Sequence, residues 1–311
     1  MANKHSVNNQ LYIFMSVATF IEYLKLEKNY SKLTVQAYHN DIETFKDFVQ
    51  SEFNITLHEV SYSQIRHWIV NMVEAGLSNR SINRKLSTLN TYYRFLMKVE
   101  ALNENPMSKH RALKTSKKVQ VPFSEQEIEN VLKNFDFYNS FEDIRDKLII
   151  ELFYSTGIRR IELVALKLSN IDLANSTLKV LGKRNKERVV PLLSSVKKTL
   201  KHYIEARNDM VYIKDTDHFF LTKKGVKIYE TLVYRIINSY FSKVSTKVKT
   251  SPHILRHSFA THLLNQGADI NAVKELLGHT SLAATQVYTH SSIAELKKIH
   301  LVSHPRSKKK T

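Results

Sequence analysis

A polar, basic stretch at residues 99–121 is the feature that most restricts how this chain can fold. It contains NENPMSKHRALKTSKKVQ, has Pro106 near its start and Pro122 directly after its end, and shows little apolar periodicity, which is typical of a linker. The chain of 311 residues is long enough for two ordinary domains, each with its own core. We therefore predict a domain over 10–98, a linker over 99–121, a second domain over 122–301 and a basic tail over 302–311.

The segment before the linker predicts four helices. Apolar residues recur at spacings of three and four after Ser31 and again after Ser78, as expected for helices with one buried face. Ser61 with Gln64 has the form of a capping box, and Gly76 is a natural left-handed end for that helix. The buried face of the last helix is expected to hold Ile82, Leu86, Leu89, Tyr93 and Leu96.

The second domain is expected to be mostly helical with a small β-hairpin. Residues 177–181 and 188–192 are short β-type runs that flank the basic sequence GKRNKE. Ser124 with Glu127 fits another capping box at the start of the domain. The predicted fold class is therefore mainly α, with a four-helix N-terminal domain and a helical C-terminal domain that contains a small β-sheet. Later helix boundaries are marked by Ser251, Pro252, Gly267, Asp269, Gly278 and Ser281.

The charge of the chain indicates a polyanionic partner. Lys and Arg number 47 against 29 acidic residues, which gives a net charge of +18 and a pI near 9.7. A field of that size attracts nucleic acid or an anionic membrane, and charge alone does not choose between them. Cysteine is absent, which excludes disulfides, thiolate nucleophiles and cysteine-bound metals.

No apolar run reaches the roughly 20 residues that cross a bilayer. Residues 11–21 (LYIFMSVATFI) come closest to a signal peptide, but they continue into a charged segment without a convincing cleavage site. We interpret them as part of an amphipathic helix. We expect a cytoplasmic protein without a membrane partner.

The outer face of the fourth predicted helix carries Arg80, Arg84 and short hydroxyl side chains. Such a face is usually only a solvated helix surface. On a strongly basic chain, arginine mixed with hydroxyl groups also suits contacts to DNA phosphates. We predict Arg80 and Arg84 as DNA-binding residues, together with Lys114 and Lys117 of the basic linker.

Four short blocks of the second domain carry cationic and histidine side chains together with one tyrosine. In one block a histidine and an arginine lie three residues apart near a helix start, so both point from one helix face. The blocks are, in order, STGIRRIEL with Arg159, GKRNKER with Lys183, HILRH with His253 and Arg256, and LGHTSLAATQVYTH with His279 and Tyr288.

These blocks resemble the catalytic signature of the tyrosine recombinase, or phage-integrase, family, and their spacing is similar to that of the bacterial Xer recombinases. The likeness extends over nearly the whole chain, through RDKLIIELFYSTGIR, SPHILRHSFATHLL and the ending LKKIHLVSHPR. It implies that residues 10–98 form a SAM-like, DNA-binding core-binding domain. It also implies that residues 122–301 form the catalytic domain.

The resemblance implies one nucleophile, Tyr288, and five helpers: Arg159, Lys183, His253, Arg256 and His279. Attack on a phosphodiester builds negative charge on its non-bridging oxygens, and guanidinium groups give paired donors to such oxygens. Preorganised donors of this kind contribute about 3–4 kcal/mol each. A histidine can take the tyrosine proton, and a lysine on a hairpin is suited to protonate the departing 5′ oxygen. The covalent 3′-phosphotyrosine conserves the bond energy, so no cofactor is expected.

Two features leave alternatives beside this assignment. Arg160 adjoins Arg159, but the distance to Glu162 favours Arg159, and Glu162 is expected to orient it. His253 and His257 have metal-ligand spacing on a helix. Because no glutamate follows the first histidine and no carboxylate cluster is present, we predict no metal.

The leading interpretation is a site-specific DNA recombinase of Xer type, which would resolve chromosome or plasmid dimers. The resemblance implies double-stranded DNA as the partner, with four protomers on two recombination sites, from this chain alone or with a paralogue. The apolar stripe of Ile293, Leu296 and Ile299 fits a tail that docks on a neighbouring protomer or on the chain's own body. Two alternatives stay open: the integrase of a mobile element with the same chemistry, and a DNA-binding protein without catalysis.

Overall fold

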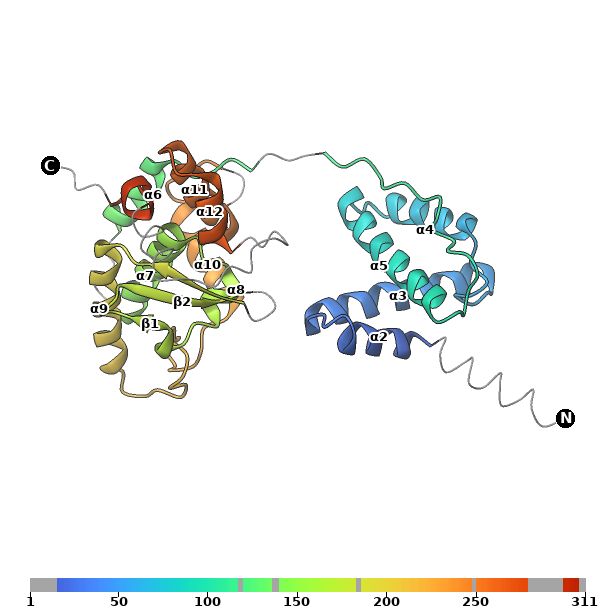
Figure 1. The fold of residues 1–311 in the computed structure, drawn as a ribbon, viewed down its shortest axis with the longest axis horizontal. Coiled ribbons are helices and arrows are strands. Elements are labelled where there is room, and N and C mark those ends of the chain that lie inside the picture. Colours follow the sequence, from blue (N-terminus) through green and yellow to red (C-terminus); the bar gives the residue numbers. More distant parts are fainter. Residues whose placement is uncertain are drawn as a thin grey trace. The chain divides into compact units, whose positions relative to one another are not determined.

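The structure is a computed structural model that describes residues 16–116, 120–135, 140–182, 186–247, 250–278 and 299–307. The chain divides into two compact units, Met1–Lys118 and Val119–Thr311 (Figure 1). Each unit has its own hydrophobic core. The predicted fold class is confirmed, because the described elements are mainly helices accompanied by a small antiparallel sheet.

The N-terminal unit is built from helices that each begin after a serine. The cap hydroxyl accepts a hydrogen bond from a backbone N–H of the first turn, which satisfies one of the donors that a helix start leaves unpaired. The predicted capping box of Ser61 and Gln64 is present. The helices are α2 (Val17–Leu26), α3 (Lys32–Phe53), α4 (Tyr62–Glu74) and α5 (Asn79–Lys98), with caps at Ser16, Ser31, Ser61 and Ser78.

The apolar stripes predicted for these helices meet in the core of the N-terminal unit. Aromatic rings lie at its centre, where Phe45 of α3 and Trp68 of α4 are in contact with ring centroids 4.7 Å apart. Burial on this scale is the main source of stability for helices of this length. The predicted inner face of α5 is confirmed, because at most 2 % of each side chain is exposed at Ile82, Leu86, Leu89, Tyr93 and Leu96.

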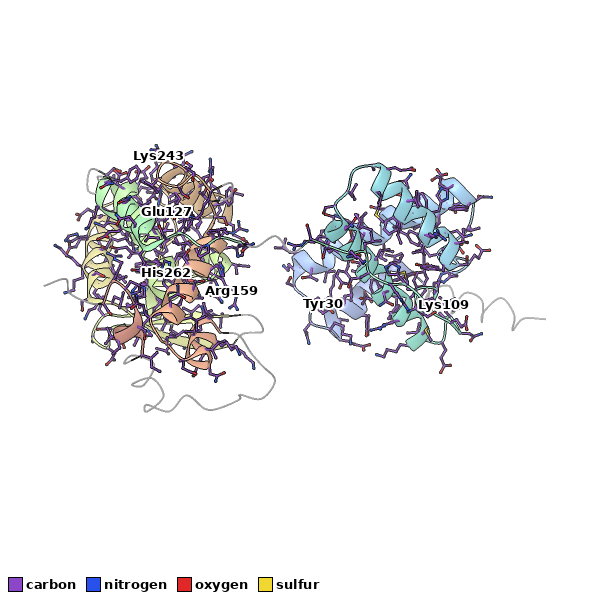
Figure 2. All side chains as sticks on the ribbon, turned by 90° about the horizontal axis from the view of Figure 1, so that it is seen from above. Tyr30, Lys109, Glu127, Arg159, Lys243 and His262 are labelled. Carbon is purple, nitrogen blue, oxygen red and sulfur yellow. The ribbon has the colours of Figure 1, made fainter. Side chains whose placement is uncertain are left out.

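The first part of the predicted linker is packed against the N-terminal unit. Met107 is 5 % exposed and belongs to the core of that unit. The side-chain amide of Asn83 accepts from the backbone N–H of Leu113 and donates to its carbonyl, both at 2.9 Å. Figure 2 shows Lys109 lying on this unit. The predicted linker over 99–121 is therefore packed on the N-terminal unit as far as about Lys114, which short-range periodicity does not reveal.

The C-terminal unit places helices around a three-stranded sheet (Figure 1). The caps predicted at Ser124 and Asp269 are confirmed, as is the helix start at Ser251 and Pro252. The described helices are α6 (Glu125–Asn134), α7 (Phe141–Thr156), α8 (Arg160–Val164), the 3₁₀ turn η1 (Leu168–Asn170), α9 (Ser194–Asn208), α10 (Glu230–Phe241), α11 (Pro252–Asn265) and α12 (Ile270–Leu277).

The sheet has the order β1–β2–β3 and is antiparallel throughout. Its strands are β1 (Ile171–Asp172), β2 (Thr177–Leu181) and β3 (Glu187–Pro191). The predicted hairpin of β2 and β3 is confirmed, with Leu178 opposite Val190. β1 was not predicted, because two residues are too few to show a period of two.

Helix α7 is the central helix of the C-terminal unit. All its residues from Leu148 to Thr156 are buried, as expected for a helix covered on every side. It packs against α9 and α11, and it ends at Gly157, whose φ of 59° is left-handed. Across the described ranges, no helix is both long and apolar enough to cross a membrane.

Candidate active site

The end of α7 positions the first predicted catalytic residue. Gly157 closes α7, and Arg159, two residues later, is the N-cap of α8. The backbone N–H of Arg159 donates to Oε2 of Glu162 at 2.8 Å, which fixes the start of α8. The side chain of Arg159 donates through Nη1 to Oε1 of Glu162 at 2.7 Å and through Nη2 to the carbonyl of Gly278 at 3.2 Å. One third of this side chain remains exposed.

Arg256 reaches the same place from α11. Its Nη1 donates to the carbonyl of Gly157, and its Nη2 donates to the carbonyl of Leu277 at 2.8 Å. Burial, followed by the nearby charge of Arg159, lowers the pKa of Arg256 to about 9. The group is therefore still a cation at neutral pH. Two predicted arginines, far apart in sequence, thus converge at one end of α12.

Glu162, which bonds Arg159, also pairs with a third arginine, Arg188 of β3. Arg188 donates to both carboxylate oxygens, through Nη1 at 2.9 Å and Nη2 at 2.7 Å. Burial alone raises the pKa of Glu162, but the bonds and charge of Arg188 and the bonds of Arg159 outweigh it and hold the pKa at about 2. The expected contact of Glu162 with Arg159 is present, through both the backbone N–H and the side chain of Arg159.

Arg188 was missed by the sequence analysis. A signal for it exists in the strand pattern, because the alternation of β3 places Arg188 on the inward face together with Val190. A charged residue at an inward position needs a buried partner. The sequence did not indicate that this partner is Glu162.

Of the remaining predicted residues of the site, some lie within the described ranges and others lie outside them. His253 is exposed on the first turn of α11, one helical turn before Arg256. Arg160 points to a different partner, with its Nε donating to Glu230 at 2.9 Å, so the geometry favours Arg159 as the active-site arginine. Outside the described residues lie Lys183, His279 and Tyr288, the predicted helix boundary Ser281, and Ile293 and Leu296 of the predicted apolar stripe.

The DNA-binding residues predicted in the N-terminal unit differ in their surroundings. Arg80 and Lys114 are exposed. Arg84 is held by a buried carboxylate instead, with Nη2 donating to Oδ1 of Asp41 at 2.9 Å. About half of the Arg84 side chain is still exposed. Lys117 lies outside the described residues.

The C-terminal residues 299–307 dock on the last turn of α7. Nε2 of His300 donates to the carbonyl of Ser155 at 2.6 Å, and Nε2 of His304 donates to that of Tyr154 at 3.0 Å. Both imidazoles are buried. These residues satisfy carbonyls that the end of α7 would otherwise leave unpaired. The predicted basic tail over 302–311 is therefore packed at least as far as Arg306.

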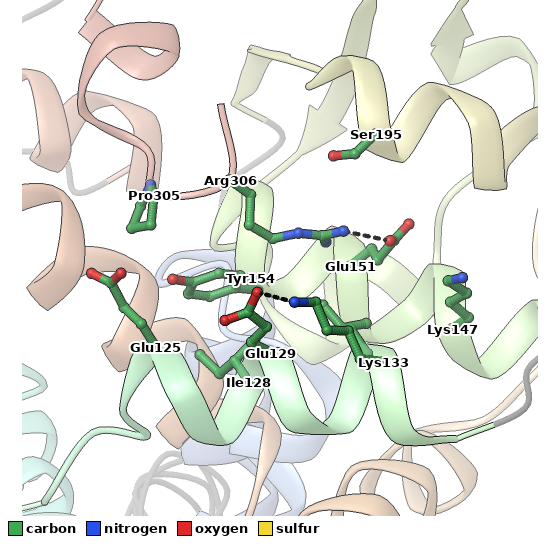
Figure 3. Close-up of a pocket in the computed structure, with 11 residues that line it drawn as sticks. Glu125, Ile128, Glu129, Lys133, Lys147, Glu151, Tyr154, Ser195, Pro305 and Arg306 are labelled. Atoms are coloured by element: carbon green, nitrogen blue, oxygen red, sulfur yellow. Dashed lines mark hydrogen bonds and ion pairs between the residues drawn. The ribbon is translucent and has the colours of Figure 1, made fainter. Parts of the chain in front are cut away.

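Arg306 anchors this C-terminal segment at a pocket of about 440 Å³ between α6 and α7. Figure 3 shows its guanidinium directed at Glu151, to which Nη2 donates at 3.0 Å. On α6, Glu129 pairs with Lys133 at 2.6 Å. Ile299 also packs against the core of its own unit.

Acidification should destabilise the C-terminal unit through His300 and His304. Burial lowers the pKa of His300 to about 4 and of His304 to about 3, while an unfolded histidine titrates near 6.5. Nδ1 of His304 accepts a hydrogen bond from the backbone N–H of Arg306. A proton on Nδ1 would remove this bond and place two N–H groups face to face. Between pH 6.5 and about 4 the unfolded chain binds protons that the folded chain does not. As the pH is lowered through this range, the free energy of unfolding therefore decreases by up to about 1.4 kcal/mol per pH unit for each histidine.

Urea denaturation at pH 7, 6 and 5 measures this slope. His304→Gln keeps a donor for the carbonyl of Tyr154 and removes one titrating group, so its free energy of unfolding should depend less steeply on pH. An unchanged slope in the variant would assign the acid sensitivity to other groups.

The sequence matches two family models: residues 122–295 fit the Phage integrase family, and residues 17–100 fit the Phage integrase N-terminal SAM-like domain. The chain belongs to the phage integrase family. Among relatives in this family, tyrosine recombinase XerC of Oceanobacillus iheyensis is 39% identical over 302 residues, with 96% of this chain and 98% of the relative covered. Tyrosine recombinase XerC of Bacillus subtilis is 35% identical over 297 residues, with 94% and 97% covered.

Solved structures of phage integrase relatives share the fold. The XerH site-specific recombinase bound to palindromic difH substrate has a TM-score of 0.69 at 21% identity, covering 94% of this chain and 82% of that one. The Tn1549 transposon integrase in complex with circular intermediate DNA has a TM-score of 0.66 at 20% identity, covering 92% and 98%. With the XerC relatives, the family assignment makes this chain a tyrosine site-specific recombinase of Xer type.

Proposed function

We propose that the chain cuts and rejoins double-stranded DNA through a covalent 3′-phosphotyrosine at Tyr288. The observation that supports this most directly is the convergence of Arg159 and Arg256 beside the end of α12. Arg159 is held by one backbone carbonyl and Arg256 by two, and both side chains are only partly buried. Two fixed cations at one place suit a single phosphate with two non-bridging oxygens.

The step that we assign to this site exchanges one phosphate ester for another. The Tyr288 oxygen forms a bond to phosphorus as the bond to the 5′ oxygen breaks. The two arginines stabilise the negative charge of the pentavalent transition state. His253 takes the tyrosine proton or holds a phosphate oxygen, His279 donates to the other oxygen, and Lys183 protonates the departing 5′ oxygen. Reversal with a new 5′ hydroxyl rejoins the strand, so the scheme includes neither a metal nor another cofactor.

We place additional phosphate contacts in the N-terminal unit, at Arg80, Lys114 and Lys117. Arg84 is a weaker candidate than the sequence indicated, because its bonds to Asp41 neutralise much of its charge. It retains an exposed edge for a phosphate. The net charge of +18 supports salt-dependent, sequence-independent attraction to DNA as the first step of binding.

For the biological role we propose resolution of chromosome or plasmid dimers, by four protomers on two sites, from this chain alone or with a paralogue. The XerC relatives, which match nearly end to end, favour this role over that of a mobile-element integrase. They also disfavour a DNA-binding protein without catalysis.

Covalent trapping tests the reaction. Wild-type protein is incubated with fragmented DNA, the protein-bound fragments are sequenced, and nicked duplexes carrying the recovered site are then used as substrates. A denaturant-resistant adduct at the 3′ phosphate is expected with wild type and not with Tyr288→Phe, which lacks the attacking oxygen. An adduct of equal yield with the Phe variant would refute Tyr288 as the nucleophile.

A further inference from the structure

Arg188 has its whole guanidinium engaged inside the protein. Its Nε donates to the carbonyl of Leu276 at 3.1 Å, and its two Nη atoms donate to the two oxygens of Glu162. Only 5 % of the side chain is exposed. Arg188 therefore has no edge left for a phosphate, whereas a third of Arg159 is exposed.

Glu162 is shared unequally between the two arginines. Arg188 bonds both oxygens, while the guanidinium of Arg159 bonds only Oε1, through Nη1. A carboxylate and a guanidinium pair best through two parallel bonds. Without Arg188, the buried carboxylate of Glu162 would have Arg159 as its nearest remaining cation, and a two-bond pair with it would withdraw Arg159 from a phosphate.

We propose that Arg188 is a positioning residue that occupies Glu162 and thereby keeps Arg159 free to bind the DNA phosphate. The inference rests on the proposed function, since it takes phosphate as the ligand of Arg159. Arg188 itself touches no reacting atom.

The end of α12 provides a second part of this arrangement. Its last carbonyls each accept from a different guanidinium: Leu276 from Arg188, Leu277 from Arg256 and Gly278 from Arg159. Cations are favoured there because the C-terminal end of a helix carries partial negative charge. The fit is close, since a Cβ on Gly278 would lie 3.2 Å from Cδ of Arg188. Arg188 thus also holds the helix end that orients the other two arginines.

The proposal is tested by single-turnover cleavage with the full-length chain. The substrate is the nicked duplex that carries the site recovered by covalent trapping. Arg188→Met should lower the rate about a hundredfold, because a small misplacement of a catalytic group has an effect of that size. Arg188→Lys should fall between Met and wild type, since an ammonium group cannot bond both oxygens in one plane.

Removal of the charge on Glu162 separates positioning from a merely structural role. If Glu162 sequesters Arg159 in Arg188→Met, then adding Glu162→Gln should raise the rate at least about tenfold above that of the single variant. A merely structural role predicts that Glu162→Gln restores stability, because it removes an unpaired buried charge, and that the rate per folded molecule does not rise. Should Arg188→Met fail to fold, Arg188→Lys with and without Glu162→Gln gives the same comparison.

Arg207 is a matched control for the loss of a buried arginine. It is 4 % exposed and its Nη2 donates to carbonyls of residues 215, 216 and 218, away from the arginines of the site. Arg207→Met should lower stability and leave the rate per folded molecule unchanged. A wild-type rate in Arg188→Met, or no recovery in the double variant, would overturn the proposal. Failure of wild type to form the adduct would instead refute the proposed function.

Discussion

Arg256→Ala should lower the single-turnover rate of DNA cleavage by about a hundred- to a thousandfold. Arg256 is preorganised by the carbonyls of Gly157 and Leu277, and removal of one such donor from a transition state costs about 3–4 kcal/mol. Arg256→Lys should recover only part of the rate, because an ammonium group cannot hold both carbonyls and also present paired donors to a phosphate. The rate of adduct formation on a nicked duplex is the measurement.

The neighbouring Arg160 supplies the control for Arg256→Ala. Arg160 is ion-paired to Glu230 at 2.7 Å, outside the cluster of the other arginines. Its replacement by alanine should change the rate by less than about threefold, as expected for a partly exposed pair. A large loss of cleavage rate in Arg160→Ala, together with a small one in Arg159→Ala, would show that Arg160 is the active-site arginine in place of Arg159.

Gly157→Ala should destabilise the C-terminal unit by about 2–5 kcal/mol. The φ of 59° is left-handed, which costs a residue with a Cβ about 1–2 kcal/mol. The new Cβ would also lie 2.5 Å from Cδ1 of Phe259 and 2.7 Å from Cδ2 of Leu277, and relief of such overpacking typically costs about 1–3 kcal/mol more. Because the carbonyl of Gly157 holds Arg256, cleavage should weaken as well.

Gly267 lies in the same unit and separates the two contributions. Its φ of 85° is also left-handed, but no atom lies within 4 Å of the position of its Cβ. Gly267→Ala should therefore cost only the backbone part, about 1–2 kcal/mol. Urea denaturation compares the two variants, and equal losses would show that the contacts with Phe259 and Leu277 relax without cost.

The helix starts were predictable because their chemistry is local. A serine hydroxyl that caps a helix bonds a backbone N–H two or three residues later, so Ser31, Ser61, Ser78 and Ser124 carry the signal within one turn of chain. The stripe of α5 was predictable for the same reason, because the helical period acts over three and four residues.

Contacts between distant segments could not be read in this way. The pair of Arg84 with Asp41 joins residues 43 apart, and the bond of Asn83 to Leu113 joins residues 30 apart. The first pair ties a half-exposed arginine to a buried carboxylate, and the second packs a segment that looks exposed in the sequence. Helix α7 shows the same limit, because burial on all sides leaves no amphipathic period to read.

The sequence by itself determined which candidate reactive groups the chain carries: two arginines, a lysine, two histidines and a tyrosine, in the order that is similar to the family signature. Only the tertiary structure decided how the arginines are held. Arg256 bonds Gly157 across 99 residues and Arg188 bonds Leu276 across 88, so the end of α12 can orient three guanidiniums at once. The reason is that residue type and spacing specify which groups are present, whereas the direction of each guanidinium depends on carbonyls that only the folded chain brings within reach.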